Sequence, residues 1–241
     1  MIKFSLIGPA VRSELYLRTY NRLNKNNSTS FELIFVGNNP PQEKMPDNFK
    51  YIFSESSPAC CIEIAAREAK GEFLIITPDD CAYSDKFLDN MKKSLDDFGD
   101  KKMIIGARYK QDGIFNDECL TFDLKIKDSV PLPAQATYKR TDWLKLGGLD
   151  SRFDLSFCDA DMIMRMYEIG YCLHIHKDVW IDEELIKNKK LRKIRMWKIT
   201  GKSGRKLLNS LWVKDGKMSK TRLDKLHPFP EDIYNVKKWS R

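Results

Sequence analysis

Two adjacent carboxylates, Asp79 and Asp80, follow an apolar run of strand length at residues 73–77 (FLIIT). The carboxyl end of a buried strand is where α/β sheets bind their ligands, so this position favours a functional site. Neighbouring carboxylates repel each other unless a cation or hydrogen-bond donors offset them, and Mg²⁺ or Mn²⁺ held by carboxylates and substrate phosphates is a natural solution. A solvated turn after Pro78 would explain the same residues, so the local pattern leaves both interpretations open.

A second acidic pair, Asp159 and Asp161, stands at the start of a segment with helical apolar spacing. The positive end of a helix dipole stabilises carboxylates there, and helix capping alone would account for the pair. Gly147 and Gly148 come shortly before it, where they either let the backbone approach a ligand closely or simply end a preceding helix. Their spacing alone does not choose between these uses.

The elements that would position these residues alternate along the first three quarters of the chain. Apolar runs predict strands at residues 3–7, 31–36, 51–53, 73–77 and 103–107, and later at 120–126, 136–139 and 172–181. Helical spacing predicts helices at 14–23, 59–70 and 159–169, one after Ser84 and one from Thr141. This order predicts an α/β fold with a mostly parallel, Rossmann-like sheet and helices on both faces. Right-handed crossovers then bring the strand carboxyl ends, and any ligand, to one edge.

Charge is unevenly spread along the chain. The 241 residues carry 42 Lys and Arg against 34 Asp and Glu, a formal charge of +8, but residues 185–241 alone hold 18 basic and 4 acidic side chains. We therefore expect an acidic domain at 1–184 and a basic, mainly helical C-terminal extension at 185–241. Residues 191–213 mix aliphatic and Trp side chains with Lys and Arg, which fits an anionic membrane surface, a nucleic acid or polyanion site, or helices packed on the domain with a solvated basic face.

Composition excludes several classes of protein. A hydrophobic fraction of 42% with 32% charged residues is globular, and neither disordered nor collagen-like. No apolar run approaches the roughly 18 residues that span a bilayer, and the N-terminus does not resemble a signal peptide. The six cysteines form no zinc-type cluster with the three histidines, so we expect reduced thiols in a cytoplasmic protein.

The two acidic segments and their flanking runs resemble the family 2 glycosyltransferases. Residues 65–80 (AAREAKGEFLIITPDD) are similar to the family's helix and strand that end at a metal-binding DxD motif. Residues 146–171 (LGGLDSRFDLSFCDADMIMRMYEIGY) are similar to its Gly-Gly loop and Glu-Asp helix, and residues 3–10 and 31–41 are similar to its first two strands. The motifs occur in the family's order, and the resemblance covers residues 2–182.

This resemblance implies a glycosyltransferase A fold and a metal-dependent, inverting transfer of a hexose from a nucleotide diphosphate-sugar to a hydroxyl of a glycan or lipid-linked glycan. It makes Asp159 the catalytic residue and Asp79 and Asp80 the ligands of Mn²⁺ or Mg²⁺. It assigns the following residues to the donor: Pro9, Gly37, Asn38, Asn39, Asp79 and Gly148. Asp161 and Arg165 match later polar positions of the same helix, beside the acceptor or behind the catalytic residue.

The implied mechanism places a burial requirement on Asp159. A divalent cation would offset the charge on the leaving diphosphate, and Asp159 would take the proton of the attacking hydroxyl. An ionised Asp is a weak base in water, so this role requires burial that raises its affinity for a proton.

Three departures from the family pattern bear on activity. Gly37 stands where the family usually has Asp, Pro78 takes the first DxD position, and Cys158 replaces the Glu of the Glu-Asp pair. They leave a non-catalytic relative that binds nucleic acid or another polyanion as the alternative. A nucleotidyltransferase would also share the sheet and acidic site, but residues 8–13 (GPAVRS) match its Gly-rich basic loop poorly.

The expected partners are a nucleotide diphosphate-sugar donor and a glycan or lipid-linked acceptor. Nucleic acid is not among them, because the body is acidic and carries no recognised nucleic-acid motif. We expect a cytoplasmic location, with the basic extension as the part that would touch the inner face of a membrane.

Overall fold

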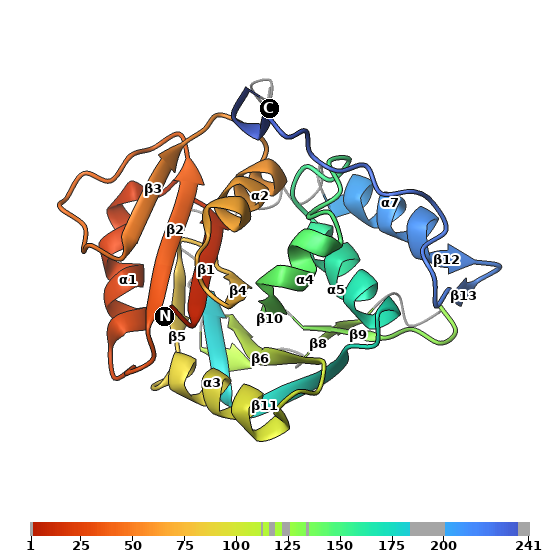
Figure 1. Ribbon diagram of the computed structural model, residues 1–241, viewed down its shortest axis with the longest axis horizontal. Coiled ribbons are helices and arrows are strands. Elements are labelled where there is room, and N and C mark those ends of the chain that lie inside the picture. Colours follow the sequence, from red (N-terminus) through yellow and green to blue (C-terminus); the bar gives the residue numbers. More distant parts are fainter. Residues whose placement is uncertain are drawn as a thin grey trace.

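The computed structural model describes residues 2–111, 113–115, 119–121, 126–133, 135–183 and 201–235, and a curled sheet lies at its centre (Figure 1). Within these residues the sheet has nine strands, eight of them in the order β3-β2-β1-β4-β10-β6-β11-β5 and the ninth, β7, paired with β6. The strands are β1 (Phe4–Pro9), β2 (Phe31–Gly37), β3 (Phe49–Phe53), β4 (Phe73–Ile76), β5 (Cys81–Tyr83), β6 (Met103–Gln111), β7 (Ile114–Phe115), β10 (Gln135–Lys139) and β11 (Cys172–Glu183). Two small ladders pair β8 (Cys119–Thr121) with β9 (Pro131–Pro133) and β12 (Val213–Lys214) with β13 (Lys217–Met218).

The N-terminal half of the sheet is parallel. Strands β3, β2, β1 and β4 run in one direction, and every residue of β2 is buried because helices cover both faces. Two helices make the crossovers, α1 (Tyr16–Asn24) and α2 (Pro58–Glu68). The start of α2 is fixed by Pro58 at its first turn and by Ser57, whose side chain accepts a 3.3 Å hydrogen bond from the Cys60 amide.

The other half of the sheet is mixed. Strand β10 runs antiparallel to both β4 and β6, whereas β6 and β11 are parallel to each other. The short strand β5 returns antiparallel to β11, and this register sets Cys81 opposite Glu183. The residue that follows Asp80 is therefore held beside the end of β11.

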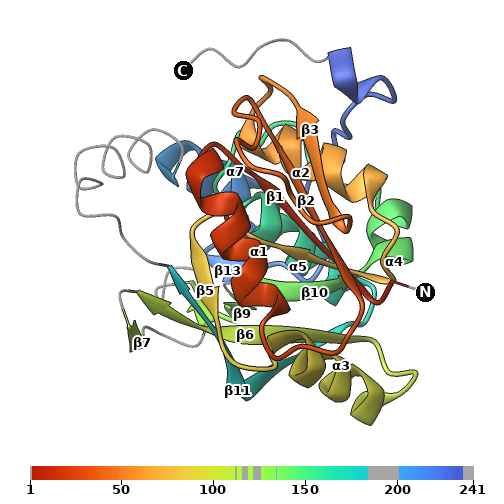
Figure 2. The ribbon, with the colours of Figure 1, turned by 90° about the vertical axis from the view of Figure 1, so that its left-hand side faces the viewer.

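Helices form a layer on each face of the sheet. One hydrophobic core packs α1 and α3 (Phe87–Phe98) against one face, and the other packs α2, α4 (Arg140–Lys145) and α5 (Cys158–Glu168) against the opposite face (Figures 1 and 2). The second of these cores also contains residues from far along the chain, namely Leu208, Leu211, Trp212, Met218, Phe229 and Ile233.

The described part of the basic extension packs on the α2–α5 side of the sheet. It contains α7 (Lys202–Trp212), the β12–β13 hairpin and a 3₁₀ turn, η3 (Ile233–Asn235). After the hairpin the chain runs back along α7 to α2, where Arg67 donates a 2.7 Å hydrogen bond to the carbonyl oxygen of Pro230 (Figure 1). These residues thus share a core with the domain. The boundary predicted at residue 184 and the basic residues of 184–200 lie outside the described residues.

The predicted α/β fold with helices on both faces is confirmed. The strands expected near β1, β2, β3, β4, β6, β10 and β11 are present, and within the mostly parallel sheet that was expected β10 and β5 are antiparallel to their neighbours. The short strand β5 was not expected, because three residues give no usable periodicity. Among the described helices, none has the length and apolar character that crossing a membrane requires.

Candidate active site

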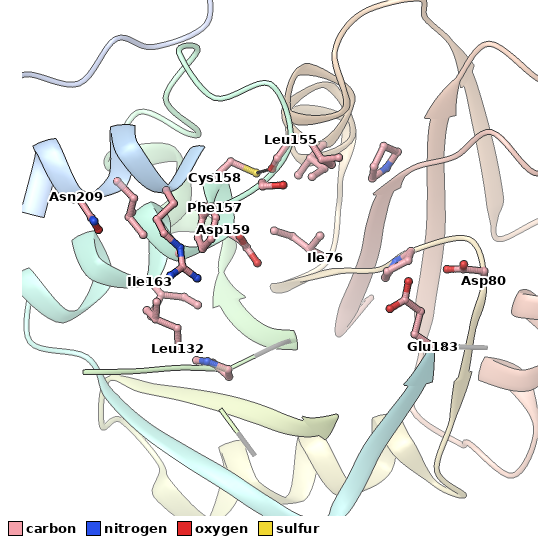
Figure 3. A pocket seen from close by; sticks show the side chains of 18 of the residues that line it. Ile76, Asp80, Leu132, Leu155, Phe157, Cys158, Asp159, Ile163, Glu183 and Asn209 are labelled. Carbon is pink, nitrogen blue, oxygen red and sulfur yellow. Dashed lines mark hydrogen bonds between the residues drawn. The ribbon is translucent and has the colours of Figure 1, made fainter. Parts of the chain in front are cut away.

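A cavity of about 550 Å³ opens where β1 and β4 end, and its volume is typical of small-molecule sites. Pro9 at the end of β1 and Pro78 just after β4 line it, as do residues of α5 and α7 such as Asp159 and Asn209 (Figure 3). Its charged and amide-bearing lining residues are Arg12, Asp80, Asp159, Glu183, Arg205 and Asn209. The two acidic segments that are far apart in the sequence therefore contribute to one site.

Asp159 lies in the first turn of α5, near the middle of the cavity in Figure 3. Its side chain is half-buried, and burial raises its pKa above the ordinary value, although the amide of Ala160 opposes this shift. A raised pKa is what a carboxylate needs to act as a proton acceptor near neutral pH. The mechanism implied by the sequence requires Asp159 to be partly buried, and the structure shows this burial.

The turn before Asp159 is strained and packed. Phe157 has φ of 72°, a left-handed conformation that is costly for a bulky side chain and persists only where packing enforces it. Helix α7 supplies that packing, because a Cβ at Gly204 would collide with the carbonyl oxygen of Ser156. The close approach of α7 thus depends on glycine and holds the segment that leads into α5.

Asp80 and Glu183 lie on the opposite side of the cavity from α7 (Figure 3). Asp80 is almost fully buried and accepts a 2.5 Å hydrogen bond from Nη1 of Arg12. Glu183 accepts a hydrogen bond from the Tyr109 hydroxyl, and the β5–β11 pairing sets it beside the residue after Asp80. The two carboxylates come from different strands and line the same wall.

Asp79 has a different environment from its neighbour. Its Oδ2 accepts hydrogen bonds from the amides of Val11 and Arg12 at 2.8 and 2.9 Å, and its Oδ1 accepts one from Arg12 Nε at 2.7 Å. Burial alone would lower the pKa of Arg12, but the charges of Asp79 and Asp80 outweigh it and raise that pKa. Asp79 thus fastens the segment after β1 to the end of β4.

These contacts decide which residue suits a divalent cation. Mg²⁺ is usually held by one or two protein carboxylates together with substrate phosphates. Asp80 and Glu183 can serve in this way because both line the cavity, whereas the oxygens of Asp79 are taken by N–H donors. In the described part of the chain no three His, Cys, Asp or Glu side chains form a metal-binding group. Metal binding stays a prediction, and Asp80 fits it better than Asp79.

A second, smaller cavity of about 70 Å³ is lined by Pro9 and by two of the three donor residues predicted at the end of β2. Pro9 lines both cavities, and Gly37 and Asn38 line the small one. Asn38 is exposed, so its amide is available to a ligand. Asn39 instead donates from its side chain to the carbonyl oxygen of Val11 at 2.5 Å, which joins the two loops.

Gly148 lies among the buried residues behind the cavity and lines neither cavity. It has φ of 72°, and a Cβ there would collide with the carboxylate of Glu63. That carboxylate accepts hydrogen bonds from Trp143 Nε1 at 3.1 Å and from the amide of Leu149 at 3.0 Å. The structure therefore gives Gly148 a role in loop packing, and the donor contact predicted for it stays a prediction.

Asp161 and Arg165 are also buried behind the cavity. Asp161 accepts hydrogen bonds from Arg165 Nε at 3.0 Å, from Trp212 Nε1 at 2.8 Å and from Arg222 Nε at 3.1 Å. Arg165 also donates to the carbonyl oxygen of Gly148 at 2.6 Å. Both residues belong to a buried charge network that stabilises α5 and the loop at Gly147 and Gly148, and the two roles predicted for them stay predictions.

Asp150 extends this network toward the C-terminal segment. It is fully buried and accepts hydrogen bonds from Arg152 Nη2 at 2.8 Å and from Arg222 Nη2 at 2.5 Å. Burial would raise the pKa of Asp150, but these bonds outweigh it and hold the pKa well below the usual range. Arg222 thus bridges two buried carboxylates that come before and within α5.

Sequence reasoning missed four charged or amide-bearing lining residues: Arg12, Glu183, Arg205 and Asn209. Glu183 lies two residues after a predicted strand end and Arg12 five residues after another, so that proximity is a signal that could have indicated them. Arg205 and Asn209 are on α7, and nothing local in the sequence shows that this helix returns to the first strands.

Comparisons with known proteins extend this description. No family model matches the chain, and no curated protein matches it. Among solved structures, residues 1–349 of TarS from S. aureus are similar, with a TM-score of 0.55 and 15% identity over 74% of this chain and 60% of that one. The same fragment in complex with UDP gives a TM-score of 0.57 and 15% identity over 83% of this chain and 65% of that one.

A longer TarS structure gives a TM-score of 0.57 and 15% identity over 82% of this chain and 39% of that one. The chain thus spans less than two thirds of the length of each of these TarS structures. Likeness at this identity is evidence of fold, and TarS is a glycosyltransferase of the A-type fold. The chain therefore has an α/β fold of the glycosyltransferase A type.

Proposed function

We propose that the protein is a glycosyltransferase that moves a hexose from a nucleotide diphosphate-sugar to an acceptor hydroxyl with inversion. The observation that carries the proposal is that the two cavities meet at Pro9. A donor lying across Pro9 would have its nucleoside at Asn38, its diphosphate beside Asp80 and its sugar next to Asp159. The fold likeness to TarS, which has a structure in complex with UDP, supports a nucleotide donor.

In this arrangement Asp159 is the proton acceptor. As the acceptor oxygen attacks the anomeric carbon, its proton passes to the Asp159 carboxylate, and the bond from that carbon to the diphosphate oxygen breaks. A single displacement of this kind inverts the anomeric configuration. Arg12 lines the cavity and places a fixed positive charge on the side where the leaving diphosphate gathers negative charge.

Asp80 and Glu183 are the residues that would hold Mn²⁺ or Mg²⁺ on the same side. When bound there, such an ion supplies a Lewis acid that stabilises the leaving diphosphate. The cavity wall around Asp80 carries more carboxylates than guanidinium groups, which favours a cation alongside an anionic donor.

A panel of nucleotide diphosphate-sugars tests the proposal. The full chain is incubated with each donor and Mn²⁺, and donor hydrolysis, thermal stabilisation and the anomeric configuration of any product are measured. We expect one donor class to stabilise the protein and to be consumed, with an inverted product. Failure of every donor to bind, together with tight and salt-sensitive binding of DNA or RNA, would instead support the polyanion-binding alternative.

A further inference from the structure

The wall of the large cavity formed by α7 has a composition that matches a particular kind of acceptor. We propose that this wall is the acceptor site and that it binds an acceptor carrying an oxyanion group next to a short apolar chain. The inference rests on the proposed transferase function and names the substrate class for its second substrate.

The position of α7 separates it from the donor side. Arg205, Leu208 and Asn209 are spaced by three and four residues, so they share one face of the helix, and all three line the cavity. Asn209 lies across Asp159 from Asp80 in Figure 3. The residues that fit the donor lie on the Asp80 side, so a second substrate reaches Asp159 from the α7 side.

Much of this wall is apolar. Leu208 lines the cavity together with Leu132, Phe157 and Ile163. A wall of aliphatic and aromatic side chains gains free energy from an apolar chain in proportion to the area that it covers. A sugar alone would leave its hydroxyl groups facing this wall without hydrogen-bond partners, at a cost in free energy.

Arg205 adds a positive charge to the apolar wall. Its side chain is exposed, with the guanidinium carbon 5.6 Å from the centre of the Phe157 ring. Arg12, the other guanidinium of the cavity, is paired with Asp79 and Asp80, whereas no ion pair joins Arg205 to a carboxylate in the part of the chain that the structure describes. A guanidinium recognises phosphate or carboxylate oxygens through paired hydrogen bonds.

Small amphiphiles test both features of the site without altering the protein. Binding of hexyl phosphate, hexanoate, 1-hexanol and ethyl phosphate to the full chain is measured by calorimetry. We expect the two hexyl anions to bind more tightly than 1-hexanol, and hexyl phosphate to bind more tightly than ethyl phosphate by roughly threefold per added methylene that becomes buried. Whether hexyl phosphate or hexanoate binds more tightly identifies the oxyanion.

Variants of α7 locate the binding site. Arg205→Gln is expected to weaken hexyl phosphate binding about tenfold, and Arg205→Lys to retain most of it. Lys206→Gln is the matched control, because Lys206 is the adjacent exposed cation on the same helix and does not line the cavity. Equal binding by wild type and Arg205→Gln would overturn the proposal, as would an equal loss in Lys206→Gln.

UDP binding separates this inference from the proposed function. We expect UDP with Mn²⁺ to bind Arg205→Gln as it binds wild type, and hexyl phosphate to bind in the presence of saturating UDP. If UDP displaces hexyl phosphate, Arg205 serves the donor phosphates and the acceptor assignment is wrong, while the transferase function stands. If no nucleotide binds but hexyl phosphate does, the transferase function fails.

Discussion

The indole Nε1 of Trp212, the last residue of α7, donates a 2.8 Å hydrogen bond to Oδ1 of Asp161 in the first turn of α5. Asp159, the proposed proton acceptor, belongs to the same turn. Helix α7 also contacts the preceding segment, where Gly204 packs on Ser156. Two separate contacts from the C-terminal segment therefore fix the turn that carries Asp159, and the basic extension forms part of the site.

Arg222 is the C-terminal residue on which this attachment depends most. Arg222→Met would leave Asp150 and Asp161 as buried carboxylates with one partner fewer, so we expect a loss of about 3–5 kcal/mol in the free energy of unfolding. Arg152→Met is the matched comparison, since Arg152 is partly exposed and Arg222 would still pair with Asp150. Urea denaturation should show the smaller loss for Arg152→Met, and a larger loss there would contradict the role given to Arg222.

The neighbouring carboxylates Asp79 and Asp80 are expected to respond differently to the same substitution. Asp79→Asn should lower the melting temperature, because a neutral amide cannot pair with Arg12 and its nitrogen cannot accept from a backbone amide. Asp80→Asn should instead abolish the stabilisation that UDP gains from added Mn²⁺. Thermal melts with UDP, with and without Mn²⁺ and chelator, measure both effects. A Mn²⁺ effect that survives in Asp80→Asn but vanishes in a folded Asp79→Asn would reverse the assignment.

Gly148 should tolerate substitution less than another glycine with a left-handed backbone. Gly148→Ala brings a Cβ against the Glu63 carboxylate, in addition to the conformational cost that Ala carries at positive φ. Gly170→Ala is the control, since φ there is 92° and nothing lies within 4 Å of the added Cβ. We expect about 1 kcal/mol of destabilisation for Gly170→Ala and clearly more for Gly148→Ala. Equal losses would mean that Glu63 moves aside freely.

The raised pKa of Asp159 links stability to pH. Because burial raises this pKa above 3.8, the folded protein binds the proton more tightly than the unfolded chain does. At pH values above both pKa values the buried charge therefore costs stability, and Asp159→Asn should melt at a higher temperature than wild type at pH 7. The difference should shrink as the pH falls through the raised pKa of Asp159, where wild type becomes protonated. A lower melting temperature for Asp159→Asn at pH 7 would show that the carboxylate stabilises the fold.

Features of the fold that depend on local sequence could be predicted, whereas features that depend on contacts between distant segments could not. Strands β1, β2 and β4 were predictable because their apolar runs are continuous and bounded by Gly or Pro, and Asp80 was predictable from its place after β4. Strand β10 is inserted antiparallel between β4 and β6, and its partner β4 lies some sixty residues earlier in the chain. Local periodicity does not indicate a pairing over such a separation.

The different roles of the two residues in each acidic pair could not be predicted either, because they depend on contacts with distant segments. Asp79 and Asp80 look equivalent in the sequence, and only the contacts with Arg12 and the cavity distinguish them. Asp161 likewise resembles a site residue until its partners Trp212 and Arg222, more than fifty residues away, are located.

The central claim is that Asp159 accepts the proton during sugar transfer, and the activity of the Asp159→Asn variant tests it most directly. This substitution removes the proton acceptor and keeps the size of the side chain. The measurement compares sugar transfer and UDP binding in wild type and in this variant, with the donor that the panel identifies. We predict that UDP binding stays within about twofold and that transfer falls by a factor of about 100 or more. Transfer at the wild-type rate in a variant that still binds UDP would contradict the account.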